Sequence, residues 1–164
     1  MKKISYLFIS LILIMNIGAC AGYKPIFGSS NLDFKIADYS ITGDKKLGNQ
    51  IYSRLYNLSQ TTKNTSGVRN IYILINVSKV KNATAKNSAG KVLAYRINLS
   101  TRVTIKDFMS NNQILNENFT ASSTYKVQDQ HFETIKLENR SIENLINETY
   151  QNLLIKLSEN ILQK

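Results

Sequence analysis

The segment IYILINVS at residues 71–78 decides the fold. Apolar side chains at every second position alternate with a second set, which is the period of a β-strand with one buried face. One face would carry Ile71, Ile73, Ile75 and Val77, and the other Tyr72, Leu74, Asn76 and Ser78. This pattern predicts a strand that packs one side against a hydrophobic core.

The same alternation returns after a connection rich in Lys, Asn, Ser and Gly. It runs over residues 93–105, where Leu93, Tyr95, Ile97, Leu99, Val103 and Ile105 would share the apolar face. Two long alternating strands around such a connection predict an antiparallel hairpin. A third strand is expected at Leu115–Val127, after a turn at Asn111–Asn112.

The flanking segments complete the fold. Residues 34–41 predict a short first strand, and Asp44–Leu58 predicts a helix that begins near Asp44. Residues 133–162 have helical periodicity, with an apolar stripe of Ile142, Leu145, Ile146, Leu153, Leu157 and Ile161. The order β-α-β-β-β-α predicts an α+β fold, a two-layer α/β sandwich. In it, two helices cover one side of a mostly antiparallel four-stranded sheet.

The N-terminus is typical of a secretory signal. Lys2 and Lys3 precede an apolar run at residues 4–17, which is too short for a spanning helix, and Gly18-Ala19-Cys20 follows. The ending Ile17-Gly18-Ala19-Cys20 resembles the lipobox of bacterial lipoproteins, which implies cleavage before Cys20 and lipid on its thiol. An ordinary signal peptide or a membrane anchor with a chance cysteine is the alternative. Cys20 is the only cysteine, so no internal disulfide is expected.

These features divide the chain into three parts. Residues 1–19 would be a cleaved lipoprotein signal peptide, residues 20–31 the lipidated cysteine and a tether, and residues 32–164 one domain. Residues 1–19 contain Lys2 and Lys3 and no acid, so their removal lowers the formal net charge from +10 to +8. A basic exported domain is expected to bind anionic lipid or a phosphorylated glycolipid, and not nucleic acid.

Basic residues gather on the predicted hairpin. No acid lies between residues 79 and 96, so this segment could hold phosphates through charge-assisted hydrogen bonds. The alternative is a solvated strand rim, where lysines discourage edge pairing. The candidate residues for binding a phosphorylated glycolipid are Lys79, Lys81, Lys86, Lys91, Arg96 and Arg102.

No catalytic motif is recognisable. His131 is the only histidine, which excludes a metal cluster built from several histidines, and it is expected to be solvated or to cap a helix. No glycine-rich phosphate loop occurs. We therefore expect a binding or assembly protein, not an enzyme, with no catalytic residue, no metal and no cofactor besides the covalent lipid on Cys20.

The chain resembles the LPS-assembly lipoprotein LptE family in its alphaproteobacterial form. The resemblance rests on the start Cys20-Ala21-Gly22-Tyr23-Lys24-Pro25-Ile26-Phe27-Gly28 and on the order of the elements, with the long hairpin, Tyr125-x-x-x-Asp129 and the closing helix. It implies an LptE-like sandwich at residues 32–164, lipid-anchored at the periplasmic face of the outer membrane.

The resemblance also implies a function. Members of the family plug the outer-membrane β-barrel LptD, help it assemble, and contact lipopolysaccharide on its way to the outer leaflet. One alternative is a transport-auxiliary lipoprotein of an exporter or phospholipid-trafficking complex. The other is a peripheral lipoprotein with an enzymatic or cell-wall role, for which the sequence offers no catalytic cluster.

Overall fold

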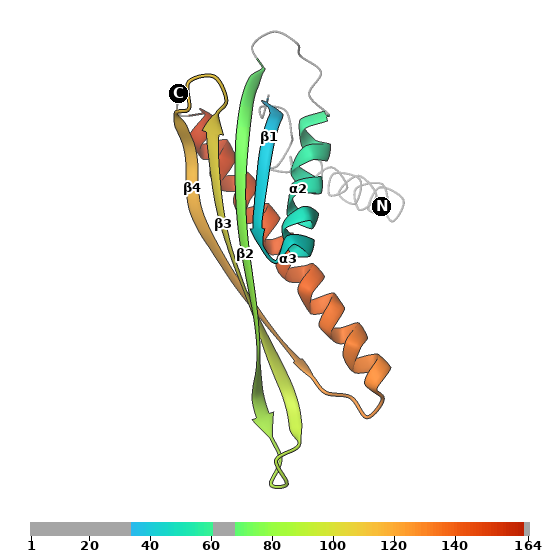
Figure 1. Ribbon diagram of the computed structural model, residues 1–164. Helices are drawn as coiled ribbons and strands as arrows, with labels where there is room; N and C mark the ends of the chain where they lie inside the picture. The colour runs from blue at the N-terminus through green and yellow to red at the C-terminus, as the bar shows by residue number, and fades with distance from the viewer. Residues whose placement is uncertain (1–33, 61–67, 163–164) are drawn as a thin grey trace, which may run out of the picture.

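The computed structural model describes residues 34–60 and 68–162. Signal peptide, tether and Cys20 lie outside these residues. The predicted order of elements is confirmed (Figure 1). The elements are β1 (Phe34–Gly43), α2 (Lys45–Gln60), β2 (Arg69–Lys86), β3 (Val92–Asp107), β4 (Gln113–Lys126) and α3 (His131–Leu162).

The four strands form one sheet in the order β1-β2-β3-β4. β2, β3 and β4 pair antiparallel, whereas β1 pairs parallel to β2. α2 makes the crossover that a parallel pair requires. The prediction of a mostly antiparallel four-stranded sheet with two helices is therefore confirmed.

Both helices cover the same face of the sheet, and the core lies between the two layers. The odd-numbered residues of β2 that alternation placed inside are at most 1% exposed. α3 buries Leu145, Ile146, Leu153 and Leu157, while Ile142 is half-buried at the edge of the core. The side chain of Ile161, the last member of the predicted stripe, lies outside the described residues.

A sharp bend joins β1 to α2. Gly43 has φ of 75°, and the next residue, Asp44, donates its backbone N–H to the carbonyl of Val77 at 2.8 Å. Asp44 also caps the helix, because its Oδ1 accepts the backbone N–H of Leu47 at 3.2 Å. The sequence placed the start of this helix correctly.

The hairpin is longer than its apolar alternation indicated. β2 continues eight residues past Ser78 to Lys86, and every residue from Ser78 to Lys86 is exposed. Leu93, which alternation assigns to the apolar face, is 44% exposed and lies outside the buried core. The strands here extend past α2 and β1, so much of their surface meets solvent on both sides (Figure 1).

Candidate functional site on the hairpin end of the sheet

The tip of the hairpin is an ordered turn. The Asn87 side-chain oxygen accepts the backbone N–H groups of Ala89 and Lys91 at 3.1 and 2.9 Å. The Asn87 backbone N–H donates to the Lys91 carbonyl at 3.0 Å, and Gly90 takes the left-handed conformation with φ of 81°. This turn holds Lys86 and Lys91, both exposed, at the far end of the sheet.

The six candidate cations do not form one patch. Lys79 and Lys81 pair with Leu99 and Ile97, whose side chains face the helices, so these two lysines lie on the helix side. Arg96 and Arg102 lie on the opposite face, which no helix covers; we call it the open face. Lys86 and Lys91 lie at the tip. The six residues therefore present cations on two faces and at the tip of one projection.

Lys81 belongs to a network that the sequence did not reveal. Its Nζ lies 2.5 Å from Glu138 Oε2 on α3, and the hydroxyl of Tyr125 donates to the same oxygen at 2.8 Å. The Lys81 ammonium also lies 4.4 Å from the ring centroid of Tyr95 and 5.6 Å from that of Tyr125, within cation–π range. The network joins the hairpin to the first turns of α3.

No acid is near the hairpin lysines in the sequence, but the fold brings acids from distant segments close to two of them. Glu138, 57 positions away, neutralises Lys81. Lys79 Nζ lies 3.9 Å from Asp44 Oδ2 at the start of α2. Both lysines support the fold at this end. Lys86, Lys91 and Arg96, in contrast, have no carboxylate partner within the described residues.

The network shifts the pKa values of its members. Burial alone would raise the pKa of Glu138, but hydrogen bonds from Lys81 and Tyr125 and the charge of Lys81 outweigh it and lower that pKa. Burial alone would lower the pKa of Lys81, and the bonds to Glu138 and Tyr125 reverse this and raise it. Both groups are charged at neutral pH, and each stabilises the charge of the other.

We expect Glu138→Gln to lower the free energy of unfolding by about 1 kcal/mol at pH 7, because the ion pair is partly exposed. Since folding lowers the pKa of Glu138, its contribution is present above the ordinary value of 4.5 and disappears as the pH falls through the folded value. Urea unfolding of both proteins from pH 7 to pH 3 measures this. A difference that stays constant down to pH 3 would contradict the assigned role.

The open face carries cations, amides and hydroxyls. On this face, every second row of paired residues across β2, β3 and β4 points outward, and none of these rows, from that of Leu74 to that of Asn82, contains a carboxylate. Arg96 Nε donates to Thr124 Oγ1 at 3.3 Å, and the Ser100 hydroxyl donates to the Asn118 side-chain oxygen at 3.2 Å. These contacts order a polar surface on the side away from the helices.

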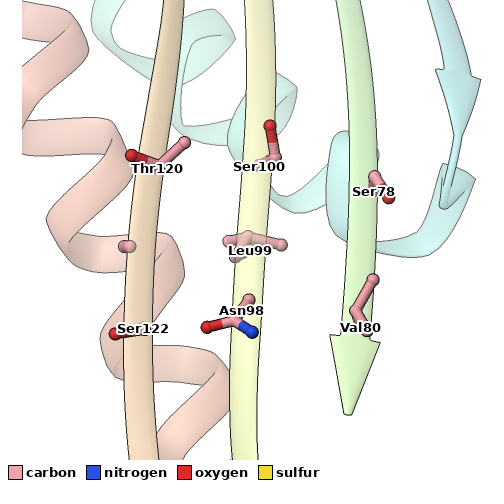
Figure 2. Close-up of a pocket in the computed structure, with 8 residues that line it drawn as sticks. Ser78, Val80, Asn98, Leu99, Ser100, Thr120 and Ser122 are labelled. Carbon is pink, nitrogen blue, oxygen red and sulfur yellow. The ribbon is translucent and has the colours of Figure 1, made fainter. Parts of the chain in front are cut away.

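A shallow depression of about 380 Å³ lies on this face. Figure 2 shows its polar side chains on three neighbouring strands, with both helices behind the sheet. They are Ser78, Asn98, Ser100, Thr120 and Ser122. Such a surface can donate hydrogen bonds to a hydroxyl-rich or phosphorylated ligand, and it can accept hydrogen bonds from the ligand's hydroxyl groups.

Other kinds of site find no support in the described residues. No cluster of three His, Cys, Asp or Glu side chains within residues 34–60 and 68–162 could hold a metal ion. His131 is exposed and is the first residue of α3, as expected. No helix in the same ranges is long and apolar enough to span a membrane.

Comparison with solved structures places the fold among bacterial lipoproteins. No family model matches the chain, and no curated protein matches it by sequence. Lipoprotein B from Nitrosomonas europaea is similar at a TM-score of 0.57 and 13% identity, over 81% of this chain and 88% of that one.

Two further lipoproteins share the fold. A minor lipoprotein from Acinetobacter baumannii has a TM-score of 0.55 and 14% identity, over 79% of this chain and 92% of its own. The rare lipoprotein B from Shewanella oneidensis has a TM-score of 0.52 and 13% identity, over 77% of this chain and 98% of its own. The chain thus has a fold found in bacterial lipoproteins, an α+β sandwich with the element order β-α-β-β-β-α.

Proposed function

We propose that this protein is a non-enzymatic outer-membrane lipoprotein. It partners an LptD-like β-barrel in the assembly of lipopolysaccharide into the outer membrane, and it contacts lipopolysaccharide. The observation that carries the proposal is the projecting hairpin, whose exposed Lys86, Lys91 and Arg96 have no acidic partner in the described part of the chain.

Two further observations support the proposal. The lipobox-like ending at Cys20 provides a membrane anchor, and the fold occurs in other bacterial lipoproteins. The resemblance to the LptE family relates this combination to a barrel partner and to lipopolysaccharide. The phosphates of lipid A are suited to the lysines at the tip, and Arg96 can bind a phosphate in bidentate fashion.

The hairpin cations give the first test. We expect the triple variant Lys86→Gln, Lys91→Gln and Arg96→Gln to bind lipopolysaccharide micelles about tenfold more weakly, because each lost cation removes a charge-assisted contact. Its thermal unfolding should hardly change, since these side chains are exposed. Lys81 is left intact because its replacement would also break the ion pair with Glu138, so that a loss of binding could not be separated from a loss of structure.

A second triple variant, which loses the same three positive charges at a distance from the hairpin, serves as the matched control. Lys35, Lys45 and Lys46 are equally exposed but lie on β1 and at the start of α2. Replacing these three with Gln should leave most of the affinity. If both triple variants bind equally well, the hairpin cations belong to a solvated rim and not to a lipid site.

The alternative function is a transport-auxiliary lipoprotein of an exporter or phospholipid-trafficking complex. Purification of the tagged, lipidated protein from native membranes separates the two. We expect a large heat-modifiable outer-membrane barrel to co-purify and to remain bound at moderate salt. Recovery of an inner-membrane transporter instead would favour the alternative, and recovery of the monomer alone would contradict the barrel partnership.

A further inference from the structure

Large apolar side chains are exposed at both ends of the sheet. At one end, the β3–β4 turn exposes Phe108 by 50% and Met109 by 84%. At the other, beside the hairpin, the first turns of α3 expose Phe132 by 70% and Ile135 by 43%. Figure 1 shows these two regions at opposite ends of the long axis. An exposed pair of this kind costs solubility, and such pairs often mark a contact surface.

The β3–β4 turn holds its apolar residues in a fixed arrangement. Asp107 Oδ1 accepts the backbone N–H groups of Met109 and Ser110 at 3.1 and 2.9 Å and the Ser110 hydroxyl at 3.0 Å. Asn111 takes the left-handed conformation, with φ of 57°. These hydrogen bonds hold the turn together, while Met109 remains exposed. The turn is ordered before it meets a partner.

This turn lies where the chain from Cys20 enters the domain. Phe34, the first residue of β1, pairs with Arg69, and the Arg69 guanidinium lies 3.7 Å from Asp107 Oδ2. The Phe108 backbone N–H also donates to the carbonyl of Asn70 at 2.9 Å. The entry point of the domain and the apolar turn therefore share one end of the sheet.

Chain length then distinguishes the two ends. Residues 21–33 separate Cys20 from Phe34, and so short a chain spans at most about 45–50 Å. β2 has 18 residues, so the hairpin tip lies about 50–60 Å from the end where β1 begins. The tether therefore keeps the Phe108–Met109 turn, at the end where the chain enters the domain, close to the bilayer that holds the lipid on Cys20, whereas it places no such limit on the tip.

We propose that the Phe108–Met109 turn inserts into the surface of the bilayer that holds the lipid anchor, as a second point of attachment. The inference rests on the lipidation of Cys20 in the proposed function. An aromatic ring and a flexible thioether suit the boundary between headgroups and acyl chains. The adjoining cation of Lys106 suits anionic headgroups, whereas Arg69 is already paired with Asp107. Two attachments at one end direct the basic hairpin away from that membrane.

The test uses the full lipidated protein with Met109→Cys. The Cys20 thiol is consumed by lipid, so the introduced thiol is the only one that a maleimide dye can label. The dye is environment-sensitive, and the protein is reconstituted into phosphatidylethanolamine–phosphatidylglycerol vesicles with or without spin-labelled lipid as quencher. The matched control is Phe132→Cys, an exposed apolar position at the other end of the molecule.

We expect the dye at residue 109 to shift to shorter wavelength and to lose most of its fluorescence to the spin-labelled lipid, and the dye at residue 132 to do neither. Quenching at residue 109 that is absent, or no stronger than at residue 132, would overturn the inference while the protein still floats with the vesicles. A protein that fails to float and is labelled at Cys20 would overturn the anchor itself, and with it both this inference and the anchored form of the proposed function.

Discussion

Replacing Cys20 with serine is expected to abolish lipid attachment completely. The thiol is the group that would be acylated, and no other cysteine can replace it. The precursor should keep residues 1–19, because cleavage before this residue follows acylation in proteins with a lipobox. Radiolabelled palmitate incorporation and the mass of the intact protein measure both effects.

The adjacent Ala21→Ser provides a control, since it changes a small residue that follows the cysteine. It should be labelled and cleaved like the wild type. Normal palmitate incorporation by Cys20→Ser would end the lipoprotein assignment, and with it the proposed second attachment at the β3–β4 turn.

The second large effect is expected from Gly43→Ala. A Cβ on Gly43 would lie 2.1 Å from the backbone carbonyl oxygen of Val77, and neither backbone can move without disturbing the pairing of β1 with β2. The residue also has a positive φ, which costs an alanine about 1–2 kcal/mol by itself. We expect a total loss of about 3 kcal/mol or more in the free energy of unfolding.

Gly90→Ala separates the two contributions. Gly90 has a similar φ of 81°, but nothing lies within 4 Å of the position that its Cβ would take. Its loss should be only about 1 kcal/mol, the cost of the backbone conformation alone. Equal losses in the two variants, measured by urea unfolding at pH 7, would show that the close approach to Val77 is not what requires glycine at residue 43.

The fold was predictable wherever one face of an element is buried. Burial imposes alternation on β2 and β3, and Ile73 and Val103 show it clearly. The sequence did not reveal the length of the hairpin, because residues 79–86 are exposed and nothing selects for an apolar face there. Backbone pairing between the two strands extends the hairpin, even though apolar and polar side chains do not alternate in this part of it.

The site was predictable only in part. The alternation of the two hairpin strands, continued along each of them, puts Lys79 and Lys81 on the helix side and Arg96 on the open face, as the structure has them. It could not reveal Glu138, which meets Lys81 only because α3 returns along the sheet. Tyr125 gave a weak signal, since an aromatic residue near the end of a strand is typical of a partly buried position. Interactions between distant segments depend on tertiary packing, and no local pattern encodes them.

The most direct test of the barrel partnership is photocrosslinking in living cells from the open face. A photoreactive amino acid in place of Asn98 is exposed and lies beside the depression of Figure 2. We predict a light-dependent adduct with a large, heat-modifiable outer-membrane protein, identified as an LptD-like barrel by mass spectrometry. An adduct with an inner-membrane transporter, or no adduct from Asn98 or from Thr120 on the neighbouring strand, would contradict the account.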